Sequence, residues 1–590
     1  MWSDSTADTQ FQRPASSHEL AAITLTEVIN FSTRINSSPT FVLYLDAKSA
    51  FDLVLREFLI SDLYELGVKD QSLLLINERL KNRKTICEWN HTLMGPIQDE
   101  CGVEQGGPNS SEYYKIYNNE QLKLAQKSKF GIEIGSVTIS SIGQADDVVL
   151  VADNLHALQG LLDLSLYFCK KKHVTLSPGK TKLQAFTSNK NVQKVPIAPI
   201  DICIDGDSVG LVEEAEHVGI VRSVKGNLSH IQSRFSAHRK QLSAILPVGL
   251  ARGHRANPVA TLKAYQTYCL PVLLSGTAAL VLRSTEVQLI EQHVKDNVCT
   301  LQKLLPRTPP CVVYFLGGLL PATAHLHKRQ LTLFGMVCLQ RESVLLKIFE
   351  FLLSTSGCSN GSWIMQIRQL CIQYSLPSPL SLLQSPLSKT KFRTLIRSNI
   401  INYWELKLRS DAMLLPSLQF FKPQFMSLCK PHPLWSSCTS NPFEVNKAVV
   451  QARMLSGRYP TDQLTKHWNQ KNKAGVCLLE GCSGQSPGSL QHILLECPAL
   501  CSTRLNLIGL LLKTASMYPM VANILYSSFY TPDQSLRMQF LLDCSVLPAV
   551  VTLVQTHGEE ILHQLYFISR NWCYSIHRKR MELLGLYQYR

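Results

Sequence analysis

The stretch Gly143-Gln-Ala-Asp-Asp-Val-Val-Leu-Val151 places two adjacent carboxylates directly before a run of apolar residues. An earlier apolar run, Phe41-Val-Leu-Tyr-Leu45, ends in a third acid, Asp46. Short apolar runs of this kind predict buried strands, and a carboxylate at the tip of a buried strand is costly unless a cation offsets its charge. We therefore expect Asp46, Asp146 and Asp147 to meet at one sheet edge and to bind divalent metal ions there.

Each acidic motif also has a purely structural interpretation. Asp46 would then cap a helix over residues 47–60, and the pair Asp146-Asp147 would form a turn. The segments around the two motifs favour metal binding, because they agree with it in type and in order.

Four motifs follow one another along the first third of the chain. They are Leu45-Asp-Ala-Lys-Ser-Ala-Phe-Asp52, Gly102-Val-Glu-Gln-Gly-Gly-Pro-Asn-Ser110, the segment with the Asp pair, and Leu176-Ser-Pro-Gly-Lys-Thr-Lys182. This order resembles the reverse transcriptases of non-LTR (LINE-like) retrotransposons over residues 11–225, and more loosely to about residue 345. The resemblance implies an RNA-directed DNA polymerase whose partners are an RNA template, a DNA primer or target, and deoxynucleoside triphosphates.

The resemblance also assigns roles to the acids. Asp46 and Asp146 would bind two Mg²⁺ ions, with Asp147 as the supporting acid. One ion would lower the pKa of the primer 3′-hydroxyl, and the other would neutralise the leaving pyrophosphate. Phe51 would pack under the incoming sugar and exclude a 2′-hydroxyl; the alternative is a core phenylalanine on a helix over 51–66.

Two loops would complete the nucleotide site in the same family. Gln105 and Gly106 would contact the nucleotide and the template, because glycine lets a backbone approach a ligand closely. Lys180 would neutralise or protonate the leaving pyrophosphate, unless it is a solvated loop lysine. The chain departs from the family at Glu104, where a basic residue is commoner, and at Gln144, where the family has Tyr or Phe. Gln144 is either a subgroup variant or a sign of decay.

The implied fold is α+β: the palm of a right-hand polymerase with partial fingers, a helical thumb, and a mostly α-helical C-terminal region carrying a small zinc knuckle. The expected parts are a disordered N-terminus (1–14), partial fingers and palm (15–182), a primer-grip hairpin and thumb-like region (183–345), a helical linker region (346–460), a zinc-knuckle-like segment (461–510) and a helical C-terminal region (511–590). Gly219 would lie at the turn of the primer-grip hairpin. A basic helix over 228–246 would either follow a duplex backbone or be simply solvated.

Local patterns predict most of the elements in the first part of the chain. The expected elements are a helix over 20–32, a strand at 41–46, helices over 51–66 and 71–82, strands at 85–89 and 95–100, a helix over 111–127, a hairpin of 137–142 with 147–152, and a helix over 155–172. An irregular Pro/Gly-rich break is expected over 306–321.

A second group of metal-binding residue types lies near the C-terminus. Cys477, Cys482, His492 and Cys497 form a C-x4-C-x9-H-x4-C pattern. Three thiolates and one imidazole are typical of a closed tetrahedral zinc site, and the surrounding sequence resembles the CCHC segment that follows the polymerase in these elements. Such a knuckle would bind RNA or DNA. The alternative is a set of unliganded core thiols.

Composition points to a folded protein with a polyanionic partner. The chain has 590 residues, 45% hydrophobic and 17% charged, and this length predicts about three to four domains. The formal charge of +15 favours nucleic acid as the partner. The basic run His577-Arg-Lys-Arg580 is either a nuclear import or phosphate-binding patch or a solvated helix end.

Cysteine usage and apolar segments bear on the compartment. The 18 cysteines show no regular framework and no secretory signal is visible, so reduced thiols in the nucleus or cytoplasm are expected. Ala264–Leu282 carries no charge, but it contains Pro271 and several polar residues. We expect a buried helix broken at Pro271 rather than a membrane span.

The resemblance begins inside the family's fingers region. We therefore expect a 5′-truncated element with weak nucleotide binding and non-processive synthesis. The alternative function is a catalytically inactive remnant that binds nucleic acid through its basic surface and zinc knuckle. A third hypothesis is a helical scaffold without a nucleic-acid role.

Overall fold

The computed structural model describes residues 7–11, 16–81, 83–187, 202–245, 256–340, 342–355, 361–466, 472–517, 519–529 and 531–586. The chain forms two compact units, each assembled from separate stretches of sequence. The first comprises Met1–Arg234, Leu274–Glu286 and Leu326–Asn399, and the second comprises Phe235–Leu273, Val287–His325 and Ile400–Arg590.

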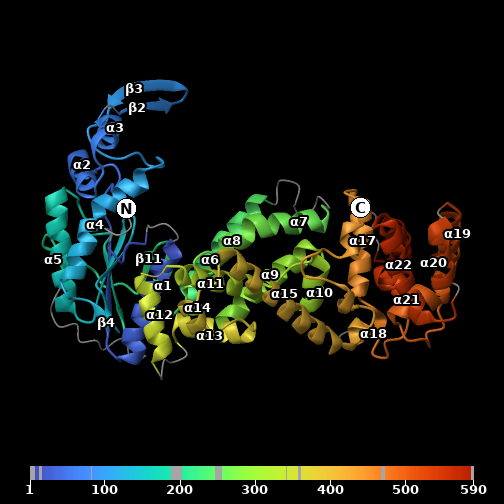
Figure 1. Cartoon of the computed structure of the whole chain (residues 1–590). Coiled ribbons are helices and arrows are strands. Elements are labelled where there is room, and N and C mark those ends of the chain that lie inside the picture. The colour runs from blue at the N-terminus through green and yellow to red at the C-terminus, as the bar shows by residue number, and fades with distance from the viewer. Residues whose placement is uncertain are drawn as a thin grey trace. The chain divides into compact units, whose positions relative to one another are not determined.

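A four-stranded antiparallel sheet forms the centre of the first unit (Figure 1). Its strands, in spatial order, are β6 (Ser141–Gln144), β7 (Asp147–Ala152), β1 (Thr40–Leu45) and β8 (Lys182–Phe186). Leu43 pairs with Leu150 on one side and with Leu183 on the other. These leucines belong to one buried core with side chains from α4 (Ser110–Lys127) and α5 (Leu155–Lys172), which therefore cover this face of the sheet.

The opposite face of the sheet is held by buried polar contacts. The Tyr44 hydroxyl donates to Gln184 Oε1 at 2.8 Å, and Gln184 Nε2 donates to the backbone oxygen of Arg222 at 3.0 Å. The Arg222 guanidinium then donates to the Ala22 oxygen at 2.6 Å and to the Thr26 hydroxyl at 3.1 Å. The hairpin of β11 (Glu214–His217) and β12 (Ile220–Ser223) is thus fixed between the sheet and α1 (His18–Asn30).

The other elements complete the chain. The remaining strands are β2 (Lys84–Trp89), β3 (Thr92–Gln98), β4 (Ile132–Ile134), β5 (Val137–Ile139), β9 (Cys203–Ile204) and β10 (Asp207–Ser208). The helices up to residue 373 are α2 (Arg56–Glu65), α3 (Asp70–Lys81), α6 (Leu228–Ile245), α7 (Pro258–Ala264), α8 (Leu270–Leu274), α9 (Ser284–Leu301), α10 (Pro310–Gly317), α11 (Ala322–Cys338), α12 (Val344–Ser354) and α13 (Trp363–Gln373). The later helices are α14 (Pro379–Gln384), α15 (Lys389–Met413), α16 (Pro433–Ser436), α17 (Pro442–Leu455), α18 (Asp462–Thr465), α19 (Cys501–Met517), α20 (Pro519–Phe529), α21 (Gln534–Leu542), α22 (Pro548–His557) and α23 (Glu560–Leu583).

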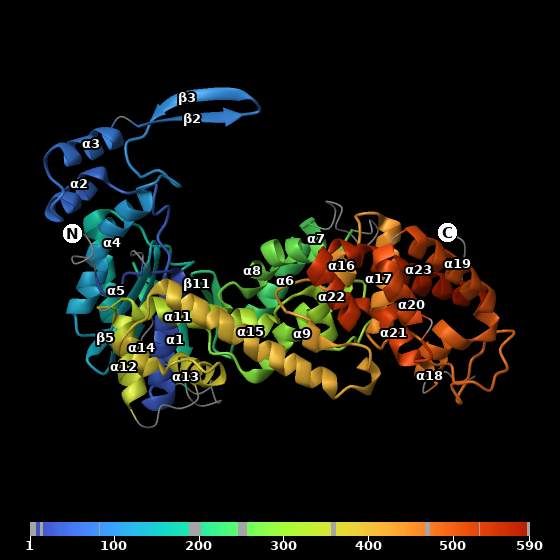
Figure 2. The ribbon, with the colours of Figure 1, turned by 45° about the vertical axis from the view of Figure 1, so that its right-hand side comes forward.

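Two predicted elements in the first unit differ from the expectation. The helix predicted from residue 51 begins at Arg56, and residues 50–53 form a turn. The predicted strand 137–142 is interrupted at Ser140, because Val137–Ile139 pairs with β4 whereas Ser141–Gln144 pairs with β7. The β2–β3 hairpin is exposed along its length and extends from α3 (Figure 2).

Part of the predicted disordered N-terminus is ordered. Gln10 bridges to Gly143 of β6 in parallel, with the Phe11 N–H donating to the Gly143 oxygen at 2.8 Å. The Ala7 N–H donates to the Asn119 side chain of α4 at 2.7 Å. Residues 7–11 therefore extend the edge of the central sheet, while 1–6 and 12–14 lie outside the described residues.

The uncharged segment 264–282 does not break at Pro271. A π-helical turn, Tyr265–Cys269, leads directly into α8, which contains the proline. A wider turn ahead of a proline relieves the clash between its ring and the carbonyl four residues earlier. None of the helices in the described part of the chain combines the length and apolar character needed to cross a bilayer.

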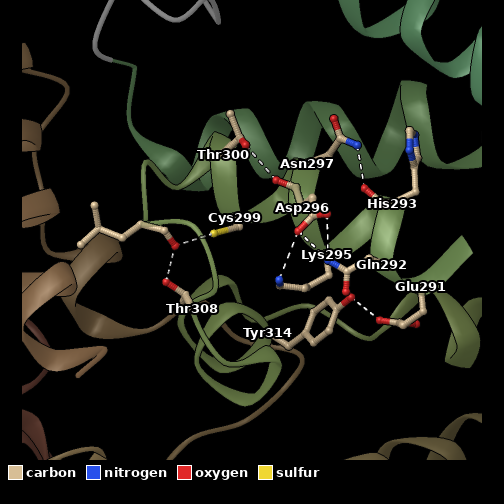
Figure 3. A network of polar contacts seen from close by, with 11 residues as sticks. Glu291, Gln292, His293, Lys295, Asp296, Asn297, Cys299, Thr300, Thr308 and Tyr314 are labelled. Atoms are coloured by element: carbon tan, nitrogen blue, oxygen red, sulfur yellow. Dashed lines mark hydrogen bonds and ion pairs between the residues drawn. The ribbon is translucent and has the colours of Figure 1, made fainter. Parts of the chain in front are cut away.

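The Pro/Gly-rich segment 306–321 is not irregular throughout. α10 begins at Pro310, which suits the first helical position because its ring fixes a helical φ. Polar contacts connect this region to α9 (Figure 3). The Tyr314 hydroxyl donates to Glu291, and the Thr308 hydroxyl and the Cys299 thiol both donate to the Leu305 oxygen. These contacts stabilise the junction between the two helices.

The basic run near the C-terminus is not a four-residue surface patch. It lies inside α23, where Arg580 is 3% exposed and donates to the Pro460 oxygen at 2.8 Å. Its guanidinium also lies 3.5 Å from the Asp462 carboxylate. His577 Nδ1 contacts the Tyr459 hydroxyl at 2.8 Å. Helical periodicity turns half of the run into the core, so it cannot present four basic groups to one ligand.

The buried Glu27 carboxyl of α1 should make stability depend on pH. It accepts from the Ser362 hydroxyl and the Ile364 N–H, and burial raises its pKa from 4.5 to about 7. Between these values the folded chain keeps a proton on Glu27 that the unfolded chain has lost, so the contribution of this carboxyl to the free energy of unfolding falls as pH rises through the window. A shift from 4.5 to about 7 corresponds to a change of on the order of 3 kcal/mol in that contribution.

Thermal unfolding between pH 5 and 8 measures this effect. The unfolding midpoint of wild type relative to that of Glu27→Gln should fall as the pH rises, because this difference isolates the proton that the Glu27 carboxyl keeps in the folded chain. The exposed Glu133→Gln serves as the control and should leave the profile unchanged. A Glu27→Gln profile as steep as that of wild type would contradict the assignment.

Candidate active site

The Asp pair lies at the tip of the β6–β7 hairpin. Gln144 pairs with Asp147, so Ala145 and Asp146 form a two-residue turn. Ala145 has φ +58°, at a turn position where glycine is usual. Such strained turns gather at functional sites. The structural interpretation of the pair as a turn therefore holds for Asp146 only, because Asp147 is the first residue of β7, and the turn places both acids at the end of a buried strand.

Asp46 lies directly beside this hairpin. β1 ends at Leu45, which pairs with Val148, so the antiparallel register continues with Asp46 opposite Asp147. Asp46 does not cap the following helix, since the residue before α2 is Leu55. The sequence-based expectation that the three acids meet at one sheet edge is confirmed in position.

The motif with Lys180 is tied to Asp46 through the backbone. The Ser177 N–H donates to the Asp46 oxygen at 2.8 Å, and the Asp46 N–H donates to the Thr181 hydroxyl at 3.4 Å. Lys180 Nζ lies 3.7 Å from Asp46 Oδ2, with 73% of its side chain exposed. The lysine is thus both solvated and directed at the acid.

These residues line a cavity of about 390 Å³. Asp46, Asp147, Lys180 and Lys182 contribute to it together with Glu216 and His217 from β11. The last two were not predicted as site residues, because no local pattern marks them and only the packing of the hairpin brings them here. His217 is 2% exposed, and neither of its ring nitrogens has a hydrogen-bond partner among the residues that the structure describes. Burial lowers its pKa to about 3, so the ring is neutral.

The cavity has an excess of negative charge. Burial, followed by the charges of Asp146, Glu216 and Asp46, raises the pKa of Asp147 to about 6. Within the described part of the chain, Asp46 Oδ2 is buried and has no hydrogen-bond partner. Carboxylates that repel one another and retain free oxygens fit Mg²⁺, which prefers oxygen ligands. The residues present therefore suit the divalent ions that the sequence predicts.

The predicted nucleotide-binding residues lie on a neighbouring surface and do not line this cavity. The Val103 N–H donates to the Phe51 oxygen at 2.8 Å, and the Gly107 N–H donates to the Glu104 oxygen at 3.1 Å. The second bond closes a turn in which Gly106 has φ +83°, a conformation that requires glycine at this turn position. Gln105 and Gly106 are exposed. The first bond holds this loop against the turn that carries Phe51.

The second candidate site gathers all four predicted zinc ligands. The ligand atoms of Cys477, Cys482, His492 and Cys497 lie within 4.8 Å of one another. Two separations are 3.8 Å, from Cys477 Sγ to Cys497 Sγ, and 3.5 Å, from Cys482 Sγ to His492 Nε2. Tetrahedral zinc with ordinary bond lengths requires about 3.8 Å and about 3.6 Å, respectively. The arrangement is compatible with zinc.

The surroundings of this cluster also suit a metal ion. Burial raises the pKa of Cys477 to about 12 and raises that of Cys497, so both thiols need a cation to ionise near neutral pH. A Glu496 carboxylate oxygen lies 3.7 Å from His492 Nδ1, which is too long for a hydrogen bond but places negative charge near the imidazole. The Trp572 indole of α23 donates to the Leu494 oxygen at 3.3 Å. The segment therefore shares its core with α23.

Comparison with known proteins places the first site in a family. Residues 4–202 match the family model for reverse transcriptase (RNA-dependent DNA polymerase). Among solved structures, the chain resembles telomerase from Candida albicans in complex with a TWJ fragment of telomeric RNA, at 12% identity and a TM-score of 0.29, over 60% of this chain and 55% of that one. It thus spans little more than half of the length of the telomerase chain. The family match contains Asp46, the Gln105 loop and the Asp pair. The likeness to a reverse transcriptase domain therefore extends over residues 4–202.

Proposed function

We propose that the protein is an RNA-directed DNA polymerase of the non-LTR retrotransposon type, with two-metal nucleotidyl transfer to a primer 3′-hydroxyl. The observation that carries this proposal is Asp46 opposite Asp147, beside Asp146, at the edge of a cavity that Lys180 also lines. Carboxylates at adjacent strand ends can hold two divalent ions a few ångströms apart.

Each residue of the site would then have a defined task. Mg²⁺ bound by Asp46 and Asp146 would supply Lewis-acid stabilisation of the entering and leaving oxygens. Asp147 supports the ion site, and Lys180, near Asp46, supplies positive charge or a proton to the leaving pyrophosphate. Phe51 excludes a 2′-hydroxyl, and Gln105 with Gly106 contacts the nucleotide and the template. Residues 15–182 would serve as palm and partial fingers, and 183–345 as primer grip and thumb.

Primer extension on an RNA template with Mg²⁺ tests this function. Incorporation of deoxynucleotides that depends on both the template and the metal ion is the expected result. Extension on a DNA template but not on an RNA template would contradict the assignment of RNA as the natural template. The absence of extension on every template would exclude the polymerase and leave nucleic-acid binding without catalysis as the function.

That alternative is a nucleic-acid-binding protein without catalysis. The formal charge of +15 and the Cys₃His cluster, which we propose holds one Zn²⁺, favour it independently of the acids. Binding of RNA or DNA through several phosphate contacts should weaken by about a thousandfold or more between 50 and 200 mM salt. Fluorescence anisotropy with a labelled oligonucleotide measures this slope. Absence of binding at any salt concentration would indicate a scaffold instead.

A further inference from the structure

The turn that carries Phe51 has a packing partner that the sequence did not indicate. Phe51 is half-buried, and its neighbours Asp52 and Leu53 are exposed. Its ring stacks on the ring of Tyr114, with centroids 4.8 Å apart and planes 26° from parallel. Tyr114 is 3% exposed and lies on α4. A buried ring beneath a half-buried one restricts where the outer ring can lie.

The same face of α4 also supports the acidic hairpin. Asn118, one helical turn after Tyr114, is 3% exposed and donates from Nδ2 to the Ala145 oxygen at 3.3 Å. Side chains four residues apart lie on one face of a helix. The charge of Asp146 contributes, after burial, to the raised pKa of Tyr114. One rigid helix thus carries contacts to both the Phe51 turn and the Asp146 turn.

We propose that Tyr114 is a positioning residue that holds the Phe51 ring against the nucleotide sugar and so sets discrimination between deoxy- and ribonucleotides. The inference rests on the proposed function and adds a residue through which Phe51 acts. An aromatic ring rejects a 2′-hydroxyl only while it cannot move away, because discrimination between such similar ligands depends on a steric clash. Without Tyr114, the Phe51 ring could retreat into the space that the tyrosine ring leaves.

Nucleotide binding without turnover measures this role. The full chain is assembled with an RNA template and a dideoxy-terminated DNA primer, and the Kd values of dUTP and UTP, which differ only in the 2′-hydroxyl, are compared. The ratio is the Kd of UTP divided by the Kd of dUTP. Tyr114→Ala should lower this ratio by about tenfold, since small displacements of positioning groups have effects of this size or larger. Tyr114→Phe keeps the ring and should retain the wild-type ratio. Tyr114→Leu, which preserves more of the packed volume, replaces Tyr114→Ala if the latter does not fold.

A double-mutant cycle separates positioning from general damage. In a Phe51→Ala background, Tyr114→Ala should have no further effect on the ratio, because residues that act through one another are not additive. Tyr113→Ala is the matched control, since Tyr113 is a buried tyrosine in the same helix and core. It should lower thermal stability and leave the ratio unchanged.

The outcomes distinguish this inference from the proposed function. An unchanged ratio in Tyr114→Ala, or an undiminished effect of Tyr114→Ala in the Phe51→Ala background, overturns the inference alone. Failure of the wild-type complex to bind either nucleotide overturns the proposed function and the inference with it. A lower ratio in Tyr114→Ala that is absent from Tyr113→Ala and Tyr114→Phe supports the inference.

Discussion

Replacing Asp146 with asparagine should reduce nucleotide incorporation by at least about a thousandfold, since metal ions supply several kcal/mol of transition-state stabilisation. The substitution preserves the shape of the side chain but removes the charge that holds a divalent ion. Asp146 is exposed at the tip of a two-residue turn, so the folded structure should tolerate the change. Single-nucleotide extension of a labelled primer on an RNA template gives the rate.

The control for this experiment is Asp153→Asn. Asp153 is an exposed carboxylate just beyond the other end of β7, outside the residues that line the cavity. It should retain wild-type activity. Incorporation that survives in Asp146→Asn would show that the mechanism is wrong, even if the domain remains a reverse transcriptase by descent.

Replacing Cys497 with serine should abolish zinc retention and destabilise the second unit. Cys497 is fully buried, and its sulfur lies 3.8 Å from that of Cys477. Structural zinc sites contribute about 10 kcal/mol or more of apparent binding energy at neutral pH, so losing one ligand should be visible in both metal content and unfolding. Zinc per chain, measured by elemental analysis after dialysis against a chelator, should fall from about one towards zero.

Cys501→Ser provides the matched comparison for zinc. Cys501 lies four residues later, is exposed, and is outside the cluster of four. Its replacement should leave the zinc content and the unfolding midpoint unchanged. The full chain is the right sample, because Trp572 and Arg580 of α23 contact the zinc-binding region and its flank. Equal zinc content in wild type and Cys497→Ser would show that these four residues are not the ligands.

The positions of the acids were predictable because they follow from local pattern. Apolar runs next to Asp46 and Asp147 predict strands, and strand ends meet at sheet edges. The spacing of the four zinc ligands was likewise readable along the chain, since a short loop can bring its own ends together. The structure confirms both groupings in position.

Other features depended on contacts that no local pattern encodes. The apolar spacing after residue 51 predicted a helix there, but the backbone bond from Val103 to Phe51 keeps residues 50–53 in a turn. The basic run 577–580 reads as a surface patch, yet Asp462 and Pro460 draw Arg580 into the core. In the first case a long-range contact outweighs a local helix preference of well under 1 kcal/mol per residue.

The sequence by itself determined the order of the motifs, the strand that ends just before Asp46, the strand that begins at Asp147, and the four candidate zinc ligands. Each of these depends on residue types within a short stretch. Only the tertiary structure decided that Glu216 and His217 share the cavity with those acids and that Tyr114 lies beneath Phe51. These neighbours come from elements far apart along the chain. Their meeting depends on strand register and on the packing of α4 and of the β11–β12 hairpin around the central sheet.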